Sequence, residues 1–146
     1  MPEIVANSVL PARRERIEFQ AADGVTLVGE LALPLEHEPV ATLICLHPLP
    51  THGGYMDSHV FRKMAWRLPA LTDFAVLRFN FRGVTSAAGT SGGEFTAGPG
   101  EGLDARAAIE YAVSRGLPSI YVVGWSFGTD VTLRYANVEQ IGRAHV

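Results

Sequence analysis

The first third of the chain has a pattern of polar and apolar positions that predicts two paired strands. Polar and apolar side chains alternate along residues 16–20, and residues 25–33 form a second run that is mostly apolar. An Asp-Gly pair at 23–24 separates the two runs, and such a pair is typical of the turn in a β-hairpin. We therefore expect an antiparallel hairpin at one edge of a sheet.

Three later segments are almost continuously apolar, as is typical of strands buried on both faces of a sheet: 41–46, 74–81 and 120–123. Helical patterns come after these segments, at about 57–68, at about 102–114 and beyond residue 128. Strands that alternate with helices in this order form a parallel sheet with helices on both faces. The pattern predicts an α/β fold, a three-layer α/β/α sandwich whose mostly parallel sheet carries the N-terminal antiparallel hairpin.

The composition is that of a globular protein and argues against several classes of function. Of the 146 residues, 47% are hydrophobic and 18% are charged, and the formal net charge is −3. A nucleic-acid partner is not expected, because it requires a concentrated basic face. No apolar run approaches the roughly 20 residues that span a bilayer, and the first residues lack a secretory signal, so no membrane association is expected. The single cysteine, Cys45, cannot form an internal disulfide and favours a cytoplasmic location.

The segment directly after the strand at 120–123 reads Gly124-Trp125-Ser126-Phe127-Gly128, which fits the Gly-x-Ser-x-Gly pattern of a nucleophile elbow. A chain that turns sharply from strand to helix crowds its own backbone, and glycines on both sides of the serine relieve the clashes that a Cβ would cause. The serine then projects at a helix N-terminus, where free N–H groups favour negative charge. The alternative is a tight turn with a serine that only caps the helix.

An acyl transfer at Ser126 needs two donors for the developing oxyanion. The N–H of Phe127, the residue after the nucleophile, is the expected first donor. The second should come from the loop after the strand at 41–46, where proline at positions 48 and 50 offers no N–H. Leu49 is therefore the best backbone candidate, and Thr51 is the second choice. The alternative is a rigid proline-rich turn that supplies no donor.

Three motifs in this order resemble those of the α/β-hydrolase superfamily: His47-Pro48-Leu49-Pro50 with Gly53-Gly54, the run from Arg78 to Val84, and the run from Gly124 to Gly128. The resemblance is to small bacterial esterases, dienelactone-hydrolase-like proteins and relatives of serine aminopeptidases, and it covers residues 16–135. It implies a Ser-Asp-His triad without a metal or other cofactor. It also implies a small-molecule acyl substrate, cleaved at an ester, thioester or amide bond through an acyl-enzyme on the serine.

The chain departs from that family in the segment after the serine. The triad order of the fold is Ser, then Asp or Glu, then His, yet only 20 residues come after Ser126. Asp130 lies one helical turn beyond the serine, and Glu139 and His145 lie too near the end of the chain to complete a triad. We therefore expect that the triad Asp and His are not present in this chain. Residues 1–140 would be the N-terminal portion of one domain, inactive as such.

The last six residues suggest a reason for this departure. Residues 141–146 read IGRAHV, which ATC-GGA-AGA-GCA-CAC-GTC encodes. That string resembles the start of a common sequencing-library adapter, so we expect 141–146 to be a non-native tail. The alternative is a natural short protein with a fortuitous end.

Two further residues are expected to support the site. His47 should brace the loop after the strand at 41–46, the loop that would supply the second oxyanion donor. Arg82 ends a strand that is expected beside the strand at 120–123. It should hold that oxyanion loop, or the loop that follows Arg82 itself. A catalytic role of His47, His52 or His59 would break the family order. Two other functions remain open: a non-catalytic binding module with the same fold, and an acyltransferase that excludes water.

Overall fold

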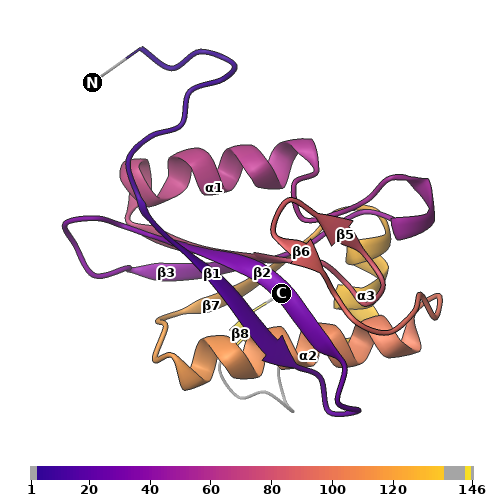
Figure 1. Ribbon diagram of the computed structural model, residues 1–146. Helices are drawn as coiled ribbons and strands as arrows, with labels where there is room; N and C mark the ends of the chain where they lie inside the picture. The colour runs from indigo at the N-terminus through magenta and orange to yellow at the C-terminus, as the bar shows by residue number, and fades with distance from the viewer. Residues whose placement is uncertain (1–2, 137–143, 146) are drawn as a thin grey trace.

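A computed structural model describes residues 3–136 and 144–145 of the chain, and its elements form a mixed sheet between two helical layers (Figure 1). The six strands of this sheet are β1 (Arg13–Gln20), β2 (Thr26–Leu33), β3 (Ala41–Leu46), β4 (Phe74–Phe79), β7 (Ile120–Gly124) and β8 (Ala144–His145). A separate small hairpin consists of β5 (Thr85–Ser86) and β6 (Gly89–Thr90). The helices are α1 (His59–Thr72), α2 (Pro99–Ser114) and α3 (Phe127–Tyr135), together with the 3-10 turn η1 (Pro50–His52). The predicted α/β fold with its N-terminal hairpin is confirmed.

The strands lie in the order β1-β2-β4-β3-β7-β8. β1 pairs antiparallel with β2, and β2 pairs antiparallel with β4, so the hairpin occupies an edge as predicted. β4, β3, β7 and β8 are parallel to one another. Because β3 lies between β4 and β7, the expectation that Arg82 ends a strand beside the elbow strand is wrong. Of the expected tail at 141–146, residues 144–145 form β8, and the others lie outside the described residues.

Each face of the sheet buries its own apolar core, because successive side chains of a strand point to opposite faces. Ile44 and Leu77 belong to the larger core, which also contains residues of α2 and α3. Cys45 and Val76 belong to a smaller core with residues of α1. In Figure 1, α1 lies above the sheet and α2 lies below it. Burial raises the pKa of the Cys45 thiol to about 12, so this cysteine acts as a small apolar residue of the core. No described helix is long and apolar enough to cross a membrane.

Helix α1 continues to Thr72, although the sequence pattern predicts an end near Leu68. Pro69 lies inside the helix and has no N–H to donate to the carbonyl of Ala65, which would ordinarily end or kink it. Arg14 replaces this donor, because its Nη2 lies 3.0 Å from the Ala65 carbonyl oxygen. A side chain from the hairpin thus allows the helix to pass through the proline.

Candidate functional site

The turn between β7 and α3 holds Ser126 in a strained backbone conformation. Ser126 has φ 56° and ψ −115°, lies outside the helix as its N-cap, and is exposed. The N–H of Trp125 donates to the carbonyl oxygen of Leu46 at 3.1 Å, which ties the turn to the end of the neighbouring strand β3. Non-glycine residues adopt such a positive φ at a cost, and they are found at sites that need a defined side-chain position. The strand, the turn and the helix have the order that a nucleophile elbow requires.

Both glycines of the motif lie where no side chain fits. A Cβ at Gly128 would lie 1.9 Å from the carbonyl oxygen of Leu46, and a Cβ at Gly124 would lie 2.5 Å from the carbonyl oxygen of Gly128. Such distances are far below van der Waals contact, and both obstacles are backbone atoms. The close approach of α3 to the ends of β3 and β7 therefore requires glycine at 124 and 128, for the steric reason inferred from the sequence.

The N–H groups of Leu49 and Phe127 are both left without a protein partner among the described residues. The Leu49 carbonyl oxygen accepts the N–H of His52 at 3.1 Å and of Gly54 at 3.0 Å, but none of the described hydrogen bonds uses the Leu49 N–H. Phe127 is the first residue of α3, where the N–H has no intrahelical acceptor. The two residues lie just beyond the carboxyl ends of adjacent parallel strands, β3 and β7. The site thus offers two free backbone donors at one edge of the sheet.

His47 is fully buried and fixes the start of the oxyanion loop, by which we mean residues 47–55. The N–H of Phe81 donates to His47 Nε2 at 3.1 Å, so the ring proton is on Nδ1, which donates to the carbonyl oxygen of Pro48 at 2.7 Å. Burial lowers the pKa of His47 to about 4. With both nitrogens occupied and the ring neutral, His47 has no free lone pair for a proton from a nucleophile. Its bonds support the bracing function and not that of a base.

Arg82 makes contacts other than those expected for it. Its guanidinium donates to Asp104 on α2 at 2.8 Å and to Asp23 in the β1–β2 turn at 2.8 Å, and its own N–H donates to Asp104 at 2.9 Å. These two carboxylates raise the pKa of Arg82. No described hydrogen bond joins Arg82 to the oxyanion loop, so it instead holds the end of β4 to α2 and to the hairpin. Asp23 and Asp104 are partners that sequence reasoning missed, because long-range pairing leaves no local pattern.

A buried glutamate fixes the loop before α2. Glu101 is 0% exposed and accepts the N–H of Thr96 at 3.0 Å, the Thr96 hydroxyl at 2.6 Å and the N–H of Gly98 at 2.8 Å. Between these donors, Ala97 is held at φ 60°. The preceding residue, Phe95, packs its ring against the ring of Phe127 with centroids 5.6 Å apart. Glu101 thus positions a loop that contacts the serine turn; a glutamate three residues after Gly98 is the available sequence signal.

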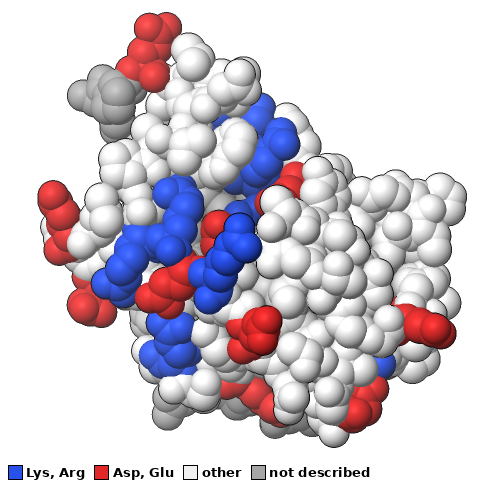
Figure 2. Space-filling model, viewed as in Figure 1, with Lys and Arg blue, Asp and Glu red and all other residues white. Residues whose placement is uncertain are grey.

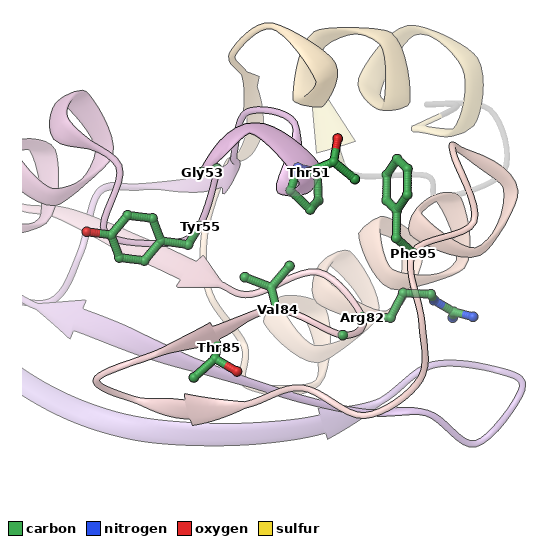
Figure 3. Close-up of a pocket in the computed structure, with 10 residues that line it drawn as sticks. Thr51, Gly53, Tyr55, Arg82, Val84, Thr85 and Phe95 are labelled. Carbon is green, nitrogen blue, oxygen red and sulfur yellow. The ribbon is translucent and has the colours of Figure 1, made fainter.

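Two open pockets lie on either side of the oxyanion loop. The first has a volume of about 480 Å³ and lies between this loop and the segment from Arg82 to Phe95 (Figure 3). The second, of about 420 Å³, lies toward α1 and is lined in part by His52, His59 and Trp125. The indole of Trp125 meets the ring of Phe61 of α1 edge-on at 6.0 Å, so this residue both packs on the helix and borders a pocket.

The run Gly100-x-Gly102-x-x-Ala105 formally fits a dinucleotide-binding glycine pattern, but its glycines serve helix packing. A Cβ at Gly102 would lie 2.4 Å from the ring of Tyr135, and one at Gly100 would lie 2.7 Å from the Thr96 hydroxyl oxygen. Both glycines lie within α2, so no tight strand-to-helix phosphate turn is present at this pattern.

Within residues 3–136, no described hydrogen bond joins Ser126 to a histidine. His52 lies 3.1 Å from the Thr51 hydroxyl, and His37 pairs with Asp73. Asp130 pairs with Arg134 one turn further along α3. His145 and Glu139, which the sequence also offers, have no described side chains. The described residues therefore supply the elbow and two donors, and they bring neither an acid nor a base to the serine.

Comparison with known proteins yields solved structures of one kind. A lidless α/β serine hydrolase from Xanthomonas campestris, XC6422, is 33% identical with a TM-score of 0.73, over 94% of this chain and 61% of its own. An α-β serine hydrolase homologue from Coxiella burnetii is 29% identical with a TM-score of 0.70, over 92% and 59%. The Pyrococcus furiosus esterase Pf2001 is 26% identical with a TM-score of 0.67, over 92% and 52%.

The sequence comparisons add one relative. The uncharacterized protein RP471 of Rickettsia prowazekii is 35% identical over 98 residues, which are 66% of this chain and 38% of that protein. No protein-family model matches the chain. The chain thus spans between about two fifths and three fifths of the length of these relatives.

A mixed sheet between two helical layers, with a serine on the bend from a parallel strand to a helix, defines the class of α/β hydrolases. The chain belongs to the α/β-hydrolase superfamily and carries the N-terminal part of its fold.

Proposed function

We propose that Ser126 is the nucleophile of a serine hydrolase that cleaves an ester, thioester or amide of a small acyl substrate. The Ser126 Oγ attacks the carbonyl carbon while a base takes its proton, and the N–H groups of Phe127 and Leu49 hold the oxyanion. The leaving group departs with that proton. Water then attacks the acyl-enzyme and releases the carboxylic acid.

The strained backbone of Ser126 is the observation that carries this proposal. A serine that only caps a helix has no need of a positive φ, and its hydroxyl would accept an N–H of the first turn. Ser126 has φ 56° and makes no such capping bond. Its exposed hydroxyl is therefore free for chemistry, beside two free backbone donors at the same edge of the sheet.

The acid and the base of the triad belong to the same proposal. We propose that a segment beyond these 146 residues supplies them, since the matched structures are longer than this chain and the fold places Asp and His after the serine. The chain of 146 residues is then expected not to hydrolyse esters by itself. A reducing cytoplasmic location also stays a proposal, suggested by the single buried thiol of Cys45.

Fluorophosphonate labelling tests the nucleophile. The protein expressed from its complete reading frame should form a covalent adduct that peptide mass spectrometry locates on Ser126. Ser126→Ala should remove the adduct, while Ser58→Ala, at the N-cap position of α1, should retain it. A folded protein without an adduct would support the non-catalytic binding module instead. If labelling occurs, incubation with an ester and an added alcohol separates the hydrolase, which releases acid, from the acyltransferase, which forms a new ester.

A further inference from the structure

We propose that the pocket beside η1 binds an apolar group attached to the scissile carbonyl, and that Phe95 is its specificity-determining wall. This inference rests on the proposed function and specifies its substrate class: an uncharged ester with an apolar acyl or alcohol group. The pocket is lined by Pro50, Thr51, Gly53, Gly54, Tyr55, Arg82, Gly83, Val84, Thr85 and Phe95.

The pocket adjoins the two proposed oxyanion donors. Pro50 and Thr51 come directly after Leu49, and the Phe95 ring packs on Phe127. In Figure 3, Thr51 and Phe95 face one another across the upper part of the pocket, with Val84 below them. A carbonyl oxygen held by Leu49 and Phe127 would therefore have this space beside it.

The lining carries no charge that is free for a substrate. Arg82 is its one charged residue, and its guanidinium is already bonded to Asp23 and Asp104. Figure 3 shows that group pointing away from the space between Val84 and Phe95. The surface around β5 and β6 in Figure 2 is also almost free of charged side chains, whereas basic side chains gather over β1 and near α1. An acidic or basic substrate group would lose its hydration here without gaining a partner.

Phe95 is held firmly enough to act as a wall. Glu101 binds both Thr96 and Gly98, so the loop immediately after Phe95 is bonded on both sides of the strained Ala97. On the other side, the Phe95 ring rests on Phe127. A side chain fixed at both ends loses little freedom on binding, which favours selection by shape.

The size of the pocket suits a short chain or a single ring. Its volume of about 480 Å³ lies in the range of small-molecule sites. Each methylene group that enters an apolar site should raise kcat/KM roughly fourfold until the space is full.

The test uses two series of uncharged esters with the protein expressed from its complete reading frame. One series lengthens the acyl group of p-nitrophenyl esters from acetate to hexanoate, and the other lengthens the alcohol of alkyl acetates from methyl to hexyl. We expect kcat/KM to rise about fourfold per methylene in one series, which identifies the group that enters the pocket. A flat profile in both series would overturn the inference.

Three variants test whether the dependence of kcat/KM on chain length comes from this pocket. Thr51→Trp, at an exposed position, should fill the space and reduce the hexyl-to-methyl or hexanoate-to-acetate ratio at least tenfold, and Phe95→Ala should lower that ratio severalfold. Phe74→Ala is the control. It removes a partly exposed ring at the start of β4, whereas Arg82 and Val84 of the pocket come after the end of that strand. It should leave the ratio within twofold of the wild type.

Fluorophosphonate labelling of Ser126 in the same samples separates the two proposals. Labelled variants with an unchanged ratio would refute the pocket and leave the hydrolase standing. If the folded wild-type protein shows neither labelling of Ser126 nor ester hydrolysis, the proposed hydrolase function itself is refuted.

Discussion

At Ser126, the residue that carries the proposed chemistry, the chain accepts local strain that its neighbours must offset. The positive φ of 56° costs of the order of 1–3 kcal/mol for a residue with a Cβ. The N–H of Trp125 bonded to Leu46 and the close contact of Gly128 with the same carbonyl oxygen fix the turn from both sides. The strained conformation of Ser126 is therefore possible only because Gly124 and Gly128 let α3 lie close to the ends of β3 and β7.

The first prediction concerns Gly128. Gly128→Ala places a Cβ 1.9 Å from the Leu46 carbonyl oxygen, so the backbone of α3 or β3 must move. We expect the free energy of unfolding to fall by about 3 kcal/mol, the upper end of the usual cost of overpacking, because the obstacle is a backbone atom. Urea denaturation followed by circular dichroism measures the loss. Gly92→Ala is the matched control: its Cβ would meet nothing closer than 3.6 Å, so a comparable loss there would contradict the steric reason.

The second prediction concerns His47 and pH. The folded pKa of about 4 lies below that of an unfolded histidine near 6.5, so the unfolded chain binds the proton more readily. The stability from neutral His47 is therefore fully present above about pH 6.5 and falls as the pH drops toward 4. The loss should reach roughly 3 kcal/mol at pH 4.

Urea denaturation at several pH values measures this dependence. His47→Gln keeps an acceptor for Phe81 without titrating, and its stability should vary less between pH 7 and 4 than that of the wild type. His59→Gln replaces an exposed histidine without a described ion pair and should retain the wild-type slope. Equal slopes for His47→Gln and the wild type would rule out a buried neutral imidazole as the cause.

At the scale of elements, α1 depends on a contact from outside the helix. The Ala65 carbonyl lacks its usual donor because of Pro69, and Arg14 from β1 supplies one at 3.0 Å. Arg14→Met should lower the free energy of unfolding by about 1–2 kcal/mol, because Ala65 is buried and its carbonyl oxygen loses a charged donor.

A double-mutant cycle isolates this effect. Pro69→Ala restores a backbone N–H that can bond to Ala65, so Arg14→Met should cost at least about 0.5 kcal/mol less in that background. Equilibrium denaturation of the four proteins gives the coupling energy. A coupling of zero would show that Arg14 does not substitute for the missing helix bond.

The elements themselves were largely predictable, and the departures have physical causes. The buried strand β3 and the turn at 124–128 have the predicted positions because their signals are local: a continuous apolar run and glycines at fixed spacing. The end of α1 was missed, since Arg14 lies 51 residues from the carbonyl it binds. The small hairpin of β5 and β6 has no counterpart among the predicted elements, because two-residue strands carry no periodicity.

At the scale of the whole molecule, the order of the strands decides which residues meet. Sequence order suggested that Arg82 lies next to the elbow strand, but β3 lies between β4 and β7. The oxyanion loop, which begins at the end of β3, is therefore the segment beside the serine turn. Arg82 lies farther from the turn and joins β4 to α2 and the hairpin. Strand order depends on the packing of all layers together, and no local pattern in the sequence states it.

The last prediction concerns this connection between layers. Asp104 is 0% exposed, and Arg82 supplies its opposite charge. Arg82→Met leaves a buried carboxylate unpaired and should cost about 3–5 kcal/mol in urea denaturation. Asp104→Asn in the Arg82→Met protein removes that charge, keeps an acceptor for the backbone N–H of residue 82, and should restore at least about 1 kcal/mol. The opposite outcome is a double variant that loses as much free energy of unfolding as the two single variants lose together. In that case the two charges do not compensate each other, and α2 is held to the sheet by its apolar contacts alone.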